Sequence, residues 1–243
     1  MRMWGPRFKH ASMVWLEPHR VHAGGQFHPF SGEPGGEGLE RILAALPLGP
    51  THWVVDDAWV PSLLLRDIVE VPSGTEQRES FFRWRYGQDL LLEAPQYVQA
   101  LAMEDNAWLL AGMPQALRDA WIHMATAAAR PMRLLQPRWL WLYNRLAPTR
   151  ELPGMLLSLS LQDEGMFTGT LAAWGHNLIL LRQWPEPATA EAWCQERVLP
   201  TIAYLQRDAR SPQELHVWGA SRWPDCGLPV RLLQPEIPAQ ESL

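Results

Sequence analysis

The 243-residue chain has two cysteines, a single lysine and no long hydrophobic run. Cys194 and Cys226 stand far apart and form no C-x-x-C pair, so the sequence favours neither a zinc site nor a disulfide framework. The apolar stretch over residues 134–146 is interrupted by Pro137 and Arg138. It is also shorter than the roughly 20 residues that a membrane-spanning helix needs. We therefore expect a protein that reaches a membrane only through a partner.

The chain also lacks a surplus of positive charge. Its formal net charge is −5 and its pI is about 5.9, which argues against a general nucleic-acid binder. The first ten residues, MRMWGPRFKH, are too polar for a secretory signal, so we expect a cytoplasmic location. Hydrophobic residues, by contrast, make up 47% of the chain, and fourteen residues are tryptophan. We expect a folded core with several tryptophans on a docking surface.

Hydrophobic periodicity predicts two α/β halves on either side of a Pro- and Gly-rich boundary at residues 147–154. The first half is predicted to contain, in order, paired strands over 11–27, a helix over 38–46, strands over 53–55 and 62–71, a helix over 75–92, a hairpin over 97–111, a helix from 113, a strand over 131–135 and a helix over 139–146. The second half is predicted to contain a three-stranded meander over 155–183, a helix over 189–206 that Pro200 kinks or splits, a strand over 214–218 and an extended tail from 229.

Residues 51–146 carry a family resemblance. An apolar-Arg-apolar-Pro strand precedes a helix with a central tryptophan, and a short turn between a helix and a strand follows. The segments concerned are Leu65–Arg66, Val71–Pro72, Phe82–Arg83–Trp84–Arg85–Tyr86 and Ala128–Ala129–Arg130–Pro131. In this order the elements resemble the middle of PilM-type and GspL-type proteins of type IV pilus and type II secretion systems.

The resemblance implies an actin-like α/β fold of two RNase H-like lobes with an inserted α/β subdomain. Lobe 1 would span residues 1–147, with the insertion at about 73–137. Lobe 2 would span 148–228, and 229–243 would form the tail. The family further implies a cytoplasmic scaffold in an inner-membrane platform, bound to the N-terminal tail of a bitopic PilN-like protein. The assembly ATPase as a second partner, and a homodimer, remain open.

The phosphate loops of the actin-like fold are altered in this chain. Such loops need a glycine so that backbone N–H groups can approach phosphate. The first loop position, residues 16–20, has no glycine and contains Pro18, which has no N–H. The second, residues 161–166, places Glu164 where its charge repels phosphate, and the adenosine-side glycine pair is reduced to Gly219–Ala220. We therefore expect a pseudo-ATPase with no enzymatic activity, cofactor or metal. The alternative is an actin-like ATPase or kinase relative with atypical phosphate loops.

The helix predicted over residues 75–92 carries more aromatic residues than one buried face can hold. Phe82 and Tyr86 lie on one face at i, i+4 spacing, while other aromatic residues fall on another side among arginines. Tryptophan beside arginine is typical of protein interfaces, although packing within the subdomain is the alternative. The candidate partner-binding residues, in this helix and more weakly in the helix over 139–146, are Phe81, Trp84, Arg85, Trp139 and Trp141.

Other polar residues favour no catalytic or metal site. Asp56 and Asp57 are neighbours whose side chains would point to opposite faces of a strand, so a turn or cap role is expected. Four histidines near the N-terminus lack a cysteine or a carboxylate cluster to complete a metal site, and we expect them in exposed loops. They are His10, His19, His22 and His28.

Overall fold

The computed structural model describes residues 11–29, 37–68, 70–146, 152–162, 165–208 and 210–233. The chain divides into two compact units, and the division falls between Pro137 and Arg138. This lies ahead of the predicted boundary at residue 147, because helix α4 (Arg138–Arg145) packs on strands of the second sheet. Each unit is built around its own five-stranded sheet.

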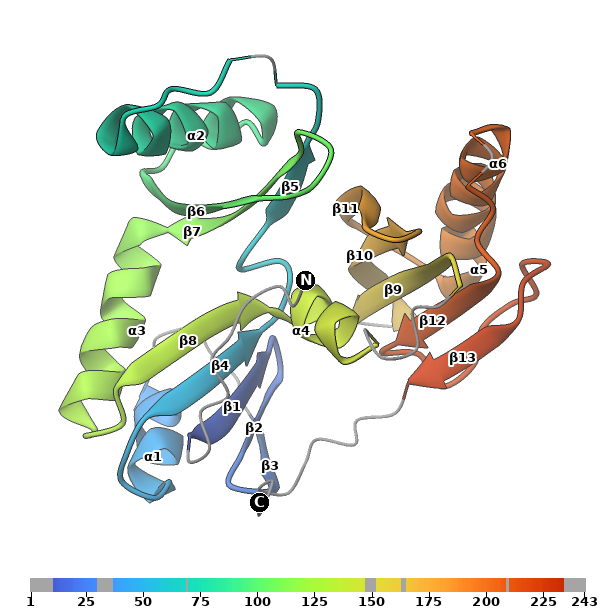
Figure 1. Cartoon of the computed structure of the whole chain (residues 1–243). Coiled ribbons are helices and arrows are strands. Elements are labelled where there is room, and N and C mark those ends of the chain that lie inside the picture. Colours follow the sequence, from blue (N-terminus) through green and yellow to red (C-terminus); the bar gives the residue numbers. More distant parts are fainter. Residues whose placement is uncertain are drawn as a thin grey trace. The chain divides into compact units, whose positions relative to one another are not determined.

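The first sheet has the strand order β3-β2-β1-β4-β8 (Figure 1). Its neighbours pair antiparallel from β3 to β1 and parallel from β1 to β8. The strands are β1 (Ser12–Glu17), β2 (Arg20–Ala23), β3 (Gln26–Pro29), β4 (Thr51–Val55) and β8 (Met132–Pro137). Two helices, α1 (Glu37–Ala45) and α3 (Gln115–Ala127), bury their apolar stripes against one face of this sheet.

The second sheet repeats this topology with the order β11-β10-β9-β12-β13. Pairing is again antiparallel on one side of the first strand and parallel on the other. The strands are β9 (Gly154–Leu161), β10 (Phe167–Trp174), β11 (Leu178–Ala188), β12 (Glu214–Trp218) and β13 (Val230–Leu233). The predicted tail from residue 229 is wrong over β13, because parallel pairing with β12 supplies that strand with backbone partners.

One face of the second sheet is covered by a continuous helical segment. It consists of α5 (Ala190–Trp193), a π-helical turn η3 (Cys194–Val198) and α6 (Leu199–Arg207). The prediction that Pro200 kinks or splits this helix corresponds to η3, because the π-helical turn ends two residues before Pro200, which has no N–H to donate. The opposite face carries α4. There Arg138 donates to the hydroxyls of Ser158 at 3.0 Å and Ser160 at 2.7 Å.

The inserted subdomain lies between β4 and α3. It is a three-stranded antiparallel sheet, β5-β7-β6, with a helix on one face (Figure 1). Its elements are β5 (Ser62–Leu65), α2 (Thr75–Asp89), β6 (Gln96–Ala102) and β7 (Trp108–Pro114). The predicted insertion at 73–137 is therefore wrong at both ends, since β5 precedes it and β8 belongs to the first sheet. The strand predicted over 62–71 stops at Leu65, because its partner β7 begins at Trp108, opposite Leu65.

Candidate functional site

Helix α2 is held to the inserted sheet by one buried face. Phe82 and Tyr86 are 2% and 0% exposed, and the Phe82 ring lies 4.5 Å from that of Trp108. The Tyr86 hydroxyl lies 2.8 Å from the carbonyl oxygen of Pro61 and 3.0 Å from that of Gly112, and it donates to these acceptors. Burial raises the pKa of Tyr86 well above its ordinary value, so the phenol stays a hydrogen-bond donor. These contacts determine which side of α2 faces solvent.

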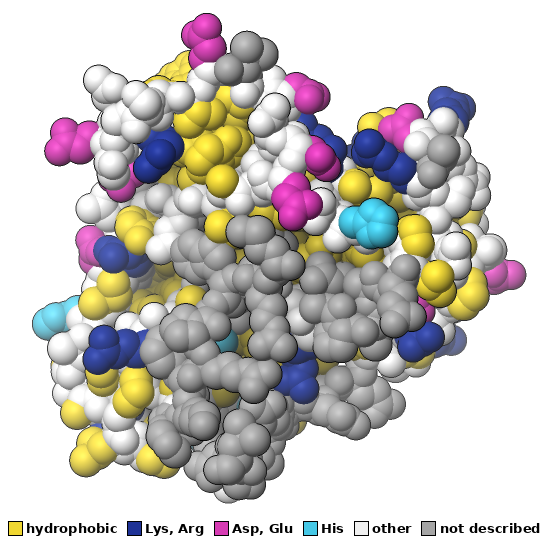
Figure 2. Space-filling view, viewed as in Figure 1, with side chains coloured by type: hydrophobic (Ala, Val, Ile, Leu, Met, Phe, Trp, Pro, Cys, Tyr) yellow, Lys and Arg dark blue, Asp and Glu magenta, His cyan; other side chains and the backbone are white. Residues whose placement is uncertain are grey.

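The core beneath this helix is small. Four hydrophobic side chains of its cluster are buried: Leu65, Phe82, Tyr86 and Leu110. Nine more are only partly buried, namely Leu63, Ile68, Val71, Phe81, Leu90, Leu92, Val98, Ala100 and Trp108. Figure 2 shows hydrophobic side chains gathered at the surface over this subdomain. Exposed apolar surface of this kind marks interaction sites in soluble proteins.

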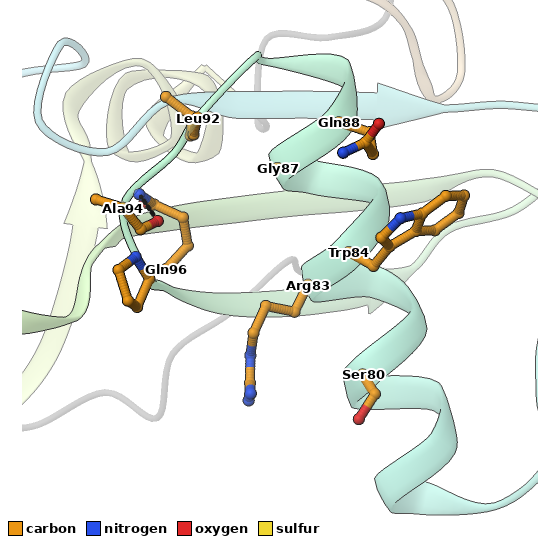
Figure 3. Close-up of a pocket in the computed structure, with 9 residues that line it drawn as sticks. Ser80, Arg83, Trp84, Gly87, Gln88, Leu92, Ala94 and Gln96 are labelled. Atoms are coloured by element: carbon orange, nitrogen blue, oxygen red, sulfur yellow. Dashed lines mark hydrogen bonds between the residues drawn. The ribbon is translucent and has the colours of Figure 1, made fainter.

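The solvent side of α2 borders an open groove with a volume of about 350 Å³. Positions 80, 83, 84, 87 and 88 of the helix form one stripe at i, i+3, i+4, i+7 and i+8 spacing. The groove is lined by Ser80, Arg83, Trp84, Gly87, Gln88, Leu92, Ala94, Pro95 and Gln96. In Figure 3, Trp84 and Gln88 project to one side of α2, whereas Leu92, Ala94 and Gln96 lie on the other, the side toward which Arg83 extends.

Helix α2 ends in a Schellman motif. The N–H of Leu91 donates to the carbonyl of Gln88 at 3.3 Å, and the N–H of Leu92 donates to that of Gly87 at 2.9 Å. The residue in the left-handed position is Leu91, at φ 52°, where glycine is usual. Its side chain is 88% exposed. A large apolar side chain is therefore held in solvent at a backbone position that disfavours it.

The predicted partner-binding residues of this helix have different surroundings. Trp84 is 59% exposed. Phe81 is half-buried and lies 5.3 Å from Phe82, ring to ring, so part of it belongs to the core. Arg85 is paired with Asp89 at 2.9 Å across one helical turn, outside the groove. Arg83 is the cation that lines the groove instead.

Trp139 and Trp141 do not form a binding surface. They are 0% and 8% exposed and lie on α4 in the other unit. The Trp139 ring packs 6.2 Å from Tyr143, and the Arg145 guanidinium lies 4.6 Å from the Trp141 ring centre. The prediction that several tryptophans are exposed is also wrong. Among the described tryptophans only Trp84 is exposed, because the others supply large apolar area to the cores.

The first phosphate-loop position is the tight turn between β1 and β2. Glu17, at the end of β1, is 8% exposed, and its carboxylate accepts from Trp15 Nε1 at 3.2 Å and from the Arg20 side chain. Pro18 follows directly and contributes no N–H. The acidic group at this position is therefore occupied by neighbouring side chains.

The second loop position joins β9 to β10. Gln162 N–H donates to the carbonyl of Met166 at 2.7 Å, and Gly165 has φ 75°. Asp163 and Glu164 lie outside the described residues. Gly219, which follows β12, has φ 92°, and a Cβ there would lie 2.2 Å from the carbonyl oxygen of Leu159. Close packing against β9 is thus sufficient to require this glycine.

Two of the remaining polar candidates, Asp56 and His22, have structural roles. The Asp56 carboxylate accepts from the N–H of Ala58 at 3.0 Å, which is the predicted turn role. His22 is not an exposed loop residue: it is 6% exposed in β2, and its ring lies 4.7 Å from Phe27. Within the described part of the chain, no three His, Cys, Asp or Glu residues are grouped so that they could hold a metal ion. None of the described helices is long and apolar enough to cross a membrane.

Comparison with known proteins gives a structural likeness only. No protein-family model and no curated protein matches the sequence. Among solved structures, the cytoplasmic domain of EpsL, an inner-membrane component of the type II secretion system of Vibrio cholerae, matches with a TM-score of 0.52. The match covers 92% of this chain and 85% of that chain, at 13% identity. The PilM–PilN type IV pilus biogenesis complex matches with a TM-score of 0.60, covering 93% of this chain and 88% of that chain, at 12% identity.

This chain has the actin-like fold of PilM and EpsL. The predicted resemblance to PilM-type and GspL-type proteins is confirmed at the level of the fold. The match to the PilM–PilN complex covers all but 7% of this chain. The inserted subdomain makes up a larger share of the chain than this uncovered part. The likeness therefore extends from the two sheets into the subdomain that carries α2.

Proposed function

We propose that this actin-like chain is a cytoplasmic scaffold in the inner-membrane platform of a type IV pilus or type II secretion system. It binds the N-terminal tail of a bitopic, PilN-like membrane protein. The observation that carries the proposal is the extent of the PilM likeness, which includes the inserted subdomain and covers 93% of this chain. PilM itself is matched as part of a complex with PilN.

The α2 surface supports a role in protein binding. It combines the exposed Trp84 and Leu91 with an open groove, in a subdomain whose core leaves many apolar side chains half-covered. Tryptophan and arginine together are typical of the residues that dominate binding energy at protein interfaces. We therefore place partner binding on α2 rather than on Trp139 and Trp141.

A pull-down from native membranes tests the proposal. The tagged full chain is bound to resin and incubated with detergent-solubilised membranes of the source cell. We expect recovery of a bitopic protein with a short cytoplasmic N-terminal tail, and loss of that protein when the tail is deleted. Recovery of no such protein, or equal recovery of the tail-less form, would contradict the proposal. A Trp84→Ala chain, expected to fold normally, shows whether α2 contributes.

The proposal also includes the absence of nucleotide turnover. It is supported by the Pro18 turn, the engaged Glu17 carboxylate and the packing requirement at Gly219. A ligand present at 100 times its Kd adds roughly 2.7 kcal/mol to the free energy of unfolding. We expect Mg-ATP to leave the thermal midpoint unchanged. A clear upward shift, accompanied by phosphate release, would instead favour an actin-like ATPase.

A further inference from the structure

The groove beside α2 has one charged group that the fold does not use. Its nine lining residues include one cation, Arg83, and no carboxylate. In the described part of the chain Arg83 has no ion pair and no hydrogen bond, although Arg85, two residues later, is paired with Asp89. An exposed guanidinium with five unengaged N–H groups is suited to a planar carboxylate, which it can bind through two parallel hydrogen bonds.

The same groove offers apolar contacts on both sides of this cation. Trp84, 59% exposed, borders it on one side, and the half-buried Leu92 borders it on the other. Leu91, which precedes Leu92 and does not itself line the groove, is exposed at a backbone angle that disfavours leucine. Strain of this kind persists where the surrounding structure or a function requires it, and Leu91 makes no core contact that would require it.

Gly87 lines the groove, and no close packing contact requires a glycine at this position. A Cβ at this position would meet nothing closer than the carbonyl oxygen of Leu92 at 3.7 Å, which is an ordinary contact. Glycine inside a helix is unfavourable relative to alanine. At Gly112 in the same subdomain, by contrast, a Cβ would lie 2.9 Å from both the Tyr86 ring and the Tyr97 carbonyl oxygen. Packing therefore explains why residue 112 is a glycine but does not explain why residue 87 is one.

We propose that this groove binds a short peptide segment of a protein partner in which a carboxylate side chain stands next to a large apolar side chain. The carboxylate pairs with Arg83, and the apolar side chain packs on Trp84 across the space that Gly87 leaves. One cation does not match the phosphate row of a nucleic acid, which needs several. The inference rests on the proposed function in one respect, namely that the chain is a scaffold whose partners are proteins.

A display library of random twelve-residue peptides, selected on the immobilised full chain, tests the inference. A Gly87→Leu chain, whose groove is filled, is used to remove peptides that bind elsewhere. We expect enrichment of peptides with Asp or Glu beside Leu, Phe or Trp. Enrichment of neutral or basic peptides would overturn the inference. So would a selection in which every enriched peptide also binds the Gly87→Leu chain.

Point variants then locate the carboxylate. We expect Arg83→Gln to weaken an enriched peptide about tenfold or more, because it removes the charged donor. Arg78→Gln is the matched control, since it removes one charge from the same helix outside the groove. It is expected to change the Kd less than twofold. Equal losses in both variants would indicate a general charge effect and overturn the assignment to Arg83.

The alternative ligand for this groove is a second copy of this chain. Sedimentation at increasing protein concentration measures the oligomeric state, and a dimer that Arg83→Gln dissociates would overturn the peptide inference.

The scaffold proposal and the groove proposal can be refuted separately. If the Arg83→Gln chain retains a native bitopic partner as well as the wild type does, and no acidic peptides are selected, the proposed peptide-binding groove is refuted and the scaffold function stands. If acidic peptides are selected but no membrane partner is recovered, the scaffold function is refuted and the peptide-binding groove stands.

Discussion

The hydroxyl of Tyr86 on α2 lies 3.0 Å from the carbonyl oxygen of Gly112 on β7, and the absence of a side chain at Gly112 allows the ring to lie there. A Cβ on Gly112 would lie 2.9 Å from two atoms of the tyrosine ring. This contact and the hydrogen bond to Pro61 fix the rotation of α2 about its axis. The rotation in turn leaves Trp84 and Arg83 in solvent.

We expect Tyr86→Phe to lower the free energy of unfolding by about 0.5–1.5 kcal/mol, because the buried hydroxyl proton is lost while the carbonyl oxygen of Pro61 still accepts from the N–H of Gly112. Gly112→Ala should cost about 1–3 kcal/mol through overpacking. Gly87→Ala is the control glycine and should raise stability by about 0.5–1 kcal/mol, since it replaces a helical glycine at an unobstructed position. Urea unfolding followed by circular dichroism measures all three. A neutral Gly112→Ala would contradict the packing at β7.

Leu91→Gly should stabilise the protein by about 0.5–1 kcal/mol, because glycine adopts the left-handed angle of φ 52° without strain. The 88% exposed side chain that is removed contributes little packing. The same substitution at Leu92, which packs against the subdomain core, should destabilise instead. Thermal and urea unfolding compare the two variants. Destabilisation by Leu91→Gly would show that the strained leucine has a structural role.

Trp139→Ala should lower stability by about 3–5 kcal/mol, as expected for a tryptophan that is 0% exposed. Trp84→Ala should change stability by less than about 0.5 kcal/mol and should weaken partner binding. Measuring unfolding and partner affinity on both variants separates the two roles. If Trp139→Ala folded normally and lost only the partner, the assignment of binding to α2 would be wrong.

Stability should fall as the pH decreases from about 6.5 toward 4. Burial lowers the pKa of His52 on β4 from 6.5 to about 4, and its Nε2 lies 2.9 Å from Nε2 of Gln136. The unfolded imidazole takes up a proton near pH 6.5 and the folded one only near pH 4. The stabilisation is therefore complete above pH 6.5 and decreases by up to roughly 3 kcal/mol on acidification.

His52→Gln should flatten this pH dependence. Part of the slope should remain, because burial, followed by the charges of His28 and Arg20, also lowers the pKa of His22. Urea unfolding at pH 7 and at pH 4.5 compares the two proteins. Identical differences between the two pH values in wild type and variant would mean that His52 is protonated equally well in the folded state.

Elements with a strong local pattern could be predicted from the sequence. The helix expected over 75–92 is α2, the hairpin expected over 97–111 is β6 and β7, and the meander over 155–183 is β9 to β11. Their apolar spacing and turn residues act over a few positions, so no distant contact is needed to find them. The limits of the insertion could not be found in this way, because β8 pairs with β4, which lies far back in the chain. The strand β13 was missed because its short segment becomes a strand only through parallel pairing with β12.

The candidate site was predictable only in part. Trp84 was found because it falls off the buried face of its helix. Arg83 was missed in favour of Arg85, although the i, i+4 spacing of Arg85 and Asp89 on the predicted helix already indicates the ion pair that the structure shows. Leu91 and Gly87 have no distinguishing pattern in the sequence. Their importance comes from a backbone angle and from the space next to the segment 92–96.

The sequence by itself determined the order of most helices and strands, the proline at the first phosphate-loop position and the clustering of aromatic residues with arginine on one helix. The tertiary structure decided which of those aromatic residues meet solvent. Trp84 and Trp139 stand in similar aromatic helices, but Trp139 is buried and Trp84 is exposed. Burial depends on which elements pack against a side chain, and in this fold those elements come from distant parts of the chain.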